Sequence, residues 1–191
     1  MHGSGHTEFH GLPFVTDPGN VFTPRPATEP LVDAALARLG DRPARVADVG
    51  TGSGAIAITL ALRVPTVEVW ASDTCGNALT LASRNAERLG AQVHLVHGDL
   101  LWGIPHDLDL IVANLPYLSP DTPGYDDEPA KAVFSSGDGL DHYRRLFAAA
   151  GDHLAATGGI VIQFDGEVLE AERNELPWLR SRLESLVAAA A

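Results

Sequence analysis

A glycine-rich segment in the first third of the chain constrains the fold more than any other feature. Residues 45–57 read RVADVGTGSGAIA, an apolar run followed by alternate glycines and an apolar helical pattern. Gly50, Gly52 and Gly54 supply positive-φ freedom and a bare backbone, which close approach of a ligand requires. A helix starting at Ala55 would direct free amide groups and its positive dipole end at that ligand. The segment therefore predicts a strand, a turn and a helix that bind a nucleotide.

The turn fits two cofactor patterns. Gly50, Gly52 and Ala55 match the loose G-x-G-x-x-(G/A) fingerprint of dinucleotide sites. Asp48 with the three glycines matches the D-x-G-x-G-x-G turn of S-adenosylmethionine (SAM) enzymes. A purely structural turn is the third reading, so the rest of the chain must distinguish them. The residues predicted to bind the cofactor here are Asp48, Gly50, Thr51, Gly52, Ser53 and Gly54.

Three further strands are predicted beyond the turn, each followed by a polar residue. They are TVEVWAS before Asp73, AQVHLVHG before Asp99, and LDLIVA before Asn114. Helices between strands imply right-handed crossovers and a parallel sheet, whose ligands bind beyond the carboxyl ends of the strands. We therefore predict a doubly wound α/β fold in which these residues converge on Gly50. Asp73 is the candidate ribose ligand, although it could instead cap the next helix.

Residues 114–117 are the most informative tetrapeptide. Asn114, Leu115, Pro116 and Tyr117 leave the fourth strand at the predicted ligand edge. Together they offer a carboxamide, backbone carbonyls, a stiff turn and an aromatic face. Such groups suit a planar amide or amino group, so we predict that this tetrapeptide binds the substrate and that Asn114, Pro116 and Tyr117 contribute to catalysis. A loop that merely leaves the strand is the alternative.

The 191 residues are predicted to form one domain. Residues 1–24 are expected to form a hairpin or tail that turns at Asp17-Pro18-Gly19. Residues 25–165 are expected to form the cofactor-binding core, and residues 166–191 a helical tail without a further strand. Thr28 is the expected N-cap of a helix that Gly40 ends. The other predicted elements are a helix at 142–156, a strand at 158–164, and an apolar helical stripe of Trp178, Leu179, Leu183 and Leu186.

Composition narrows the possible partners and location. The formal charge of −12, with Lys131 as the single lysine, disfavours nonspecific nucleic-acid binding. Cys75 is the only cysteine, and neither a membrane span nor an export signal is indicated, so a cytoplasmic protein is expected. His2, His6 and His10 are spaced as helical metal ligands, but the neighbouring glycines favour a tail or hairpin fragment, so no metal is expected.

Several segments together resemble the HemK/PrmC group of SAM-dependent glutamine N5-methyltransferases. PGNVFTPRPATEPLV is similar to its proline-arginine-x-threonine-glutamate segment, DVGTGSGAIAI to its SAM turn, ANLPYL to its Asn-Pro-Pro-Tyr signature, and EPAKAVFSSGDGLDHYRRLF to its downstream block. The resemblance covers about residues 8–165. It implies a Rossmann-like class I methyltransferase fold with SAM as the cofactor.

The resemblance also implies residue roles. Gly50 to Gly54 would surround the methionine part of SAM, Asp73 would bind the ribose, and Asp99-Leu100 would lie beside the adenine. Asn114 and a neighbouring main-chain carbonyl would accept hydrogen bonds from the glutamine NH2. Asn114 is therefore expected to contact both cofactor and substrate.

Three departures from the family pattern limit the transfer of function. The family's amino-terminal helical domain, which helps to recognise class I release factors, is expected to be missing. Leu115 replaces the first proline of the signature, which should leave the backbone freer. The last strand pair is expected to be missing, so the 158–164 strand becomes an edge that the 178–186 helix, or a second subunit in a homodimer, must shield.

The first functional hypothesis is methylation of a protein glutamine, with a release factor as one candidate substrate. Adenine-N6 methylation of DNA or RNA uses a similar Asn-x-Pro-aromatic arrangement and is the second. A degenerate SAM-binding module is the third, and a NAD-linked oxidoreductase the fourth. The acidic charge and the downstream block favour the protein substrate.

Overall fold

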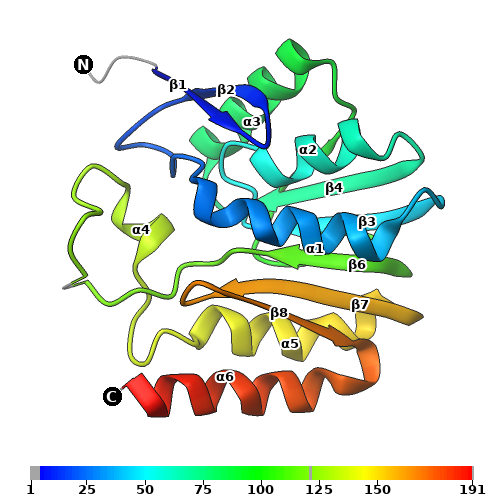
Figure 1. The fold of residues 1–191 in the computed structure, drawn as a ribbon, viewed down its shortest axis with the longest axis vertical. Helices are drawn as coiled ribbons and strands as arrows, with labels where there is room; N and C mark the ends of the chain where they lie inside the picture. Colours follow the sequence, from blue (N-terminus) through cyan, green and yellow to red (C-terminus); the bar gives the residue numbers. More distant parts are fainter. Residues whose placement is uncertain (1–4, 121, 191) are drawn as a thin grey trace.

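The fold is built on one mixed sheet, seen in the computed structural model, which describes residues 5–120 and 122–190 (Figure 1). The sheet has six strands in the order β5-β4-β3-β6-β7-β8, and all neighbours are parallel except β7 and β8. The strands are β3 (Ala44–Val49), β4 (Val67–Asp73), β5 (His94–His97), β6 (Leu108–Ala113), β7 (Leu154–Phe164) and β8 (Glu167–Glu172). The predicted doubly wound α/β fold is therefore confirmed.

Helices cover both faces of the sheet. The α-helices are α1 (Glu29–Leu39), α2 (Ala55–Arg63), α3 (Gly76–Leu89), α4 (Ala130–Val133), α5 (Asp141–His153) and α6 (Leu176–Ala190), with short 3-10 turns η1 (Pro26–Thr28) and η2 (Arg173–Glu175). Adjacent strand residues point to opposite faces. Val46 packs in the cluster that holds α1 and α2, whereas Ala47 packs in the cluster that holds α5 and α6. This arrangement leaves the carboxyl ends of the parallel strands open.

The amino-terminal hairpin exists, but its predicted turn is wrong. β1 (Gly5–Phe9) pairs with β2 (Leu12–Thr16) through the two residues His10 and Gly11, whose φ values of 51° and 74° suit a tight hairpin. Asp17 instead starts a turn after β2, where its carbonyl accepts hydrogen bonds from Asn20 and Val21.

The histidine spacing does not form one helical face. His6 lies in β1 and the His10 side chain contacts Asp33, while His2 lies outside the described residues.

The carboxyl-terminal region differs most from expectation. β8 pairs antiparallel along β7 and covers the edge that we assigned to a helix or a second subunit. Asp165 and Gly166 connect the two strands with φ values of 48° and 79°, and this Asp-Gly hairpin signal marks the strand that the sequence analysis missed. The helix begins only at Leu176. Within it Leu179 and Leu183 are buried, but Trp178 is 56% exposed and does not belong to the apolar stripe.

Candidate active site

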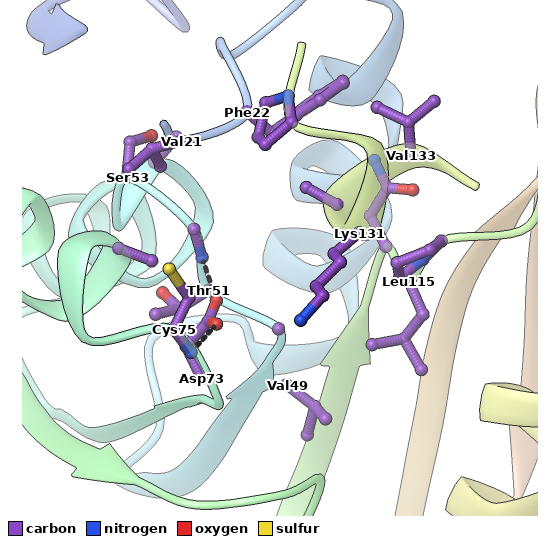
Figure 2. A pocket seen from close by; sticks show the side chains of 18 of the residues that line it. Val21, Phe22, Val49, Thr51, Ser53, Asp73, Cys75, Leu115, Lys131 and Val133 are labelled. Carbon is purple, nitrogen blue, oxygen red and sulfur yellow. Dashed lines mark hydrogen bonds between the residues drawn. The ribbon is translucent and has the colours of Figure 1, made fainter. Parts of the chain in front are cut away.

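A cavity of about 840 Å³ lies beyond the carboxyl ends of the parallel strands. Its walls come from the segment before α1, the glycine turn after β3, the residues after β4, β5 and β6, and the segment around α4. A cavity of this size lies within the usual range for small-molecule sites, about 300–1,000 Å³. Figure 2 shows Thr51 and Asp73 on one side of the cavity and Leu115 and Val133 on the other.

The glycine turn forms one wall of the cavity. Its amides at Gly50 and Thr51 both donate to the Ser72 carbonyl at 2.9 Å, which fixes the turn against the end of β4. Gly50, Gly52 and Gly54 have φ values of 76°, 54° and 83°, so each uses the freedom of glycine. The cavity wall includes four of the predicted turn residues: Gly50, Thr51, Gly52 and Ser53.

Asp48 and Gly54 support the turn from behind and do not line the cavity. The buried Asp48 carboxylate accepts hydrogen bonds from the Thr51 hydroxyl at 2.7 Å and the Ala57 amide at 3.1 Å. Burial raises the pKa of Asp48 from 3.8 to about 7, opposed by these two hydrogen bonds. An added Cβ at Gly54 would lie 2.8 Å from the Ile58 side chain, so close packing also requires this glycine.

Asp73, the last residue of β4, and Asp99, two residues after β5, both line the cavity. The alternation of strands and helices in the sequence predicts this placement. The Asp73 carboxylate accepts from the Gly52 amide at 2.9 Å and from the Cys75 amide at 2.8 Å (Figure 2). Asp73 therefore links the glycine turn to the residue before α3, and its role as a ribose ligand stays a prediction. Asp99 forms an ion pair with Arg145.

Leu100 also lines the cavity, in a backbone conformation that is uncommon for its type. Its φ is 51°, and its carbonyl accepts a hydrogen bond from the Ser72 hydroxyl at 2.6 Å. Left-handed backbone at a non-glycine residue costs about 1–2 kcal/mol and must be held by its surroundings. The Ser72 contact supplies part of that constraint beside Asp99.

The 114–117 tetrapeptide lines the opposite part of the cavity. The Asn114 carboxamide donates from Nδ2 to the Thr28 hydroxyl at 3.1 Å, which directs Nδ2 to Thr28 and leaves Oδ1 as a hydrogen-bond acceptor. We expected the Thr28 side chain to cap α1. Thr28 does occupy the N-cap position, but its side chain contacts Asn114 and makes no capping bond.

Leu115 has a backbone N–H that the proline of the family signature lacks, and this N–H fixes its position. Its amide donates to the Tyr143 hydroxyl at 3.1 Å, and that hydroxyl lies 2.5 Å from the Gln163 carbonyl but 3.4 Å from the Leu115 carbonyl. The expectation of a freer backbone is wrong because this contact anchors Leu115. The single Tyr143 hydroxyl hydrogen favours Gln163, so the Leu115 carbonyl keeps capacity to accept another bond.

Pro116 and Tyr117 complete the signature. The Tyr117 ring packs against Phe164 with centroids 4.9 Å apart, and burial raises the pKa of the Tyr117 phenol. An added Cβ on Gly139, which has a φ of 81°, would lie 2.4 Å from the Tyr117 carbonyl. The downstream block therefore packs directly on the signature loop.

Two site residues were missed in the sequence. Gln163, at the end of β7, is buried and donates from Nε2 to the Ala27 carbonyl at 2.6 Å, while its Oε1 has no partner among the described residues. Thr28 and Gln163 come from segments distant in sequence, so only the strand order brings them to Asn114. A polar residue inside the apolar GGIVIQF run was the available signal for Gln163.

A polar and aromatic contact joins two segments of the cavity wall. The Arg25 guanidinium lies 3.2 Å from the Glu128 carboxylate and 4.3 Å from the Tyr125 ring centroid. The Thr23 amide donates to the other oxygen of Glu128 at 3.0 Å. Arg25 thus joins the segment before α1 to the segment before α4.

The parallel sheet, the glycine turn and the acidic residue after the second strand of the core define a class I methyltransferase fold. The solved structure of the 16S rRNA methyltransferase RsmC from T. thermophilus is similar with a TM-score of 0.62 and 18% identity, covering 83% of this chain and 41% of that one. The methyltransferase small domain model matches residues 14–126. The chain belongs to that family, and within it to the release factor glutamine methyltransferases of the HemK/PrmC group.

Two curated relatives show the extent of the match. The release factor glutamine methyltransferase of Bacillus anthracis is 41% identical over 157 residues, covering 74% of this chain and 54% of that protein. The enzyme of the same name from Deinococcus radiodurans is 37% identical over 188 residues, covering 93% of this chain and 67% of that protein. The chain thus spans between about half and two thirds of the length of these relatives.

Proposed function

We propose that this domain binds SAM in the cavity and transfers its methyl group to the side-chain amide nitrogen of a protein glutamine. The observation that carries this proposal is the acceptor set beside the glycine turn. Asn114 Oδ1 is oriented by Thr28, and the Leu115 carbonyl lies next to it. These oxygens can accept the two hydrogens of an NH2 group.

The cavity residues fit SAM in size and chemistry. Gly50, Gly52 and the neighbouring amides give close access to the backbone, and Asp73 offers carboxylate lone pairs for ribose hydroxyls. Asp99 and Leu100 also line the cavity, and we assign them to the adenine, as the family resemblance implies. When bound, SAM would supply an electrophilic methyl group on a sulfonium.

The protein's part in the reaction is to position the amide. An amide nitrogen is a poor nucleophile because its lone pair is delocalised into the carbonyl. Alignment alone can lower the barrier by roughly 7–11 kcal/mol at best. Acceptors on the NH2 group stabilise the positive charge that grows on nitrogen during in-line displacement. The buried Asp48 does not line the cavity and is therefore not the base that takes the amide proton.

The relatives' names make a class I release factor the first substrate to test. The purified domain should be incubated with SAM and a class I release factor, and the product mapped by tandem mass spectrometry. We expect one added methyl group on a glutamine side chain, formed at least about 10²-fold more slowly by Asn114→Ala. Methylation of adenine in a parallel DNA or RNA reaction, with no protein modified, would contradict the proposal.

No helix within the described residues is long and apolar enough to cross a membrane. Cytoplasmic location and a homodimer stay predictions.

A further inference from the structure

Lys131, the only lysine of the chain, lines the cavity on α4. Figure 2 shows its side chain extending from α4 into the cavity, toward the side where Thr51 and Asp73 lie. No role in the proposed reaction has been assigned to it.

The other charged side chains on the cavity wall already have partners. Arg25 pairs with Glu128, Asp99 pairs with Arg145, and the Asp73 carboxylate accepts two backbone amides. Lys131 forms no ion pair within residues 5–120 and 122–190, although the chain carries 25 acidic residues. Lys131 is therefore the unpaired cation of the cavity as the structure describes it.

An unpaired ammonium favours an anionic group on the ligand. A glutamine side chain has no anionic group. SAM has one, the α-carboxylate of its methionine part, and its sulfonium and α-ammonium would repel lysine. The carboxylate is therefore the only group of these two ligands that Lys131 can pair with.

We propose that Lys131 binds the α-carboxylate of the SAM methionine part. The assignment rests on the proposed use of SAM but not on the identity of the methyl acceptor. Because Lys131 is exposed in the free protein, its ammonium reaches the ligand without a large loss of hydration. Its position on α4 places it in the same segment of the cavity wall that the Arg25–Glu128 ion pair joins to the residues before α1.

Calorimetry with two ligands tests this assignment. S-adenosylhomocysteine carries the carboxylate, and its decarboxylated analogue, S-adenosyl-3-thiopropylamine, lacks only that group. Lys131→Met should weaken binding of S-adenosylhomocysteine about tenfold, equal to about 1.4 kcal/mol, but should not weaken binding of the analogue. Lys131→Arg keeps the charge and should restore most of the affinity. Arg182→Met, on α6, controls for loss of one positive charge and should change neither affinity.

The outcomes separate this inference from the proposed function. Equal S-adenosylhomocysteine affinity in Lys131→Met and the wild type would overturn the carboxylate assignment, as would an equal loss for both ligands. A wild type that binds S-adenosylhomocysteine more tightly than the analogue, with the difference removed by Lys131→Met, supports it even if no glutamine is methylated. No binding of either ligand to the wild type would overturn both proposals.

Discussion

Asp48 shows how a residue behind the site can make the protein sensitive to pH. Its carboxylate is fully buried, one oxygen has no partner among the described residues, and its pKa is about 7 in the folded state. A carboxyl whose folded pKa exceeds the unfolded value binds its proton more tightly when folded. Ionisation of Asp48 therefore lowers the free energy of unfolding progressively as the pH rises from about 4 to about 7. Above about pH 7 this loss of stability stays constant.

Asp48→Asn should remove this pH dependence because the amide resembles the protonated acid. Relative to the wild type, the variant should gain about 2–3 kcal/mol of unfolding free energy between pH 5 and pH 8. Urea unfolding at the two pH values measures the difference, and other titrating groups cancel in the comparison. A constant gap between the two proteins would show that Asp48 has an ordinary pKa in the fold.

Thr28 orients Asn114 and should act on methyl transfer through it. Thr28→Val keeps the shape of the buried side chain but removes the acceptor for Asn114 Nδ2. Transfer should fall by about tenfold, the size of one hydrogen bond, with SAM affinity nearly unchanged. Thr28→Ser retains the hydroxyl and should keep most of the activity. If the serine and valine variants lost activity equally, the contact to Asn114 would not explain the effect.

At the scale of elements, the segment around α4 is fastened to the segment before α1 by one ion pair. The Glu128 side chain is only 6% exposed, so removing Arg25 leaves a buried carboxylate held chiefly by the Thr23 amide. Arg25→Met should therefore loosen residues 122–134 and speed release of bound SAM.

Hydrogen exchange with mass spectrometry can detect this loosening. We expect faster exchange across residues 122–134 in Arg25→Met, with β3 unchanged. Arg42→Met, which removes an exposed charge 4.0 Å from Asp109, is the matched control and should exchange like the wild type. Identical exchange in all three proteins would mean that the ion pair does not hold this segment.

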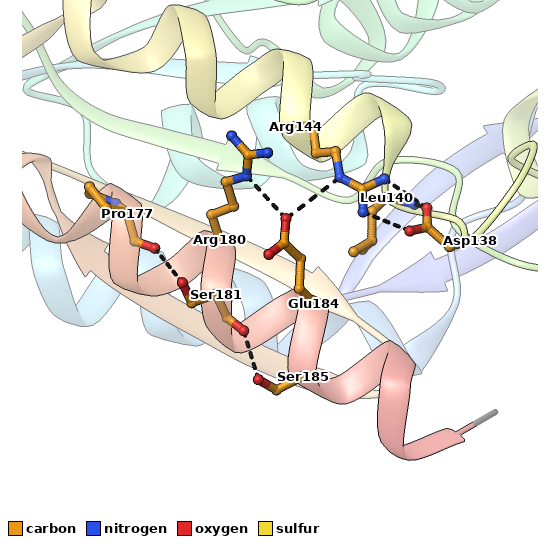
Figure 3. A network of polar contacts seen from close by, with 8 residues as sticks. All are labelled: Asp138, Leu140, Arg144, Pro177, Arg180, Ser181, Glu184 and Ser185. Atoms are coloured by element: carbon orange, nitrogen blue, oxygen red, sulfur yellow. Dashed lines mark hydrogen bonds and ion pairs between the residues drawn. The ribbon is translucent and has the colours of Figure 1, made fainter.

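The carboxyl-terminal helix α6 is attached by two kinds of contact. Glu184 lies between Arg144 and Arg180, and Arg144 also pairs with Asp138, whose pKa it holds near 2 (Figure 3). These groups are partly exposed, and such pairs are worth about 0.2–1 kcal/mol each. Leu183, by contrast, is 1% exposed in the core.

Leu183→Ala should therefore cost about 2–5 kcal/mol of unfolding free energy, while Glu184→Gln should cost less than about 1 kcal/mol. Denaturant titrations of the two variants compare these contributions directly. A larger loss in Glu184→Gln than in Leu183→Ala would show that the polar network, not the apolar stripe, holds α6.

At the scale of the whole molecule, the sheet closes its own edge. β8 covers β7, and its outer residues include Glu167, Glu170 and Glu172, of which the last two pair with Arg38 on α1. Charges on an edge strand oppose pairing with another chain. The homodimer was predicted because a second subunit could shield the exposed edge of β7. Since β8 covers that edge, this reason for a homodimer no longer holds.

The sequence predicted correctly those elements whose conformation depends only on their own residues. The strand ending at Val49, the turn after it and the helix from Ala55 follow from buried apolar runs and alternate glycines. β8 was missed because EVLEAE is rich in glutamate, which favours helices, and pairing with β7 outweighs that preference. Thr28 and Gln163 could not be assigned, because their roles depend on the packing of β6 between β3 and β7.

The two halves of the cavity have separate roles in the proposed reaction: one binds SAM, and the other positions an amide. Asn114 lies in the second half, so its carboxamide should matter to the transition state more than to cofactor affinity. The most direct test is single-turnover methyl transfer by Asn114→Ala, with SAM affinity measured on the same preparation.

We predict SAM affinity within about tenfold of the wild type, and transfer to the glutamine acceptor reduced by at least about 10²-fold. Transfer by Asn114→Ala at the wild-type rate would contradict the amide-positioning account.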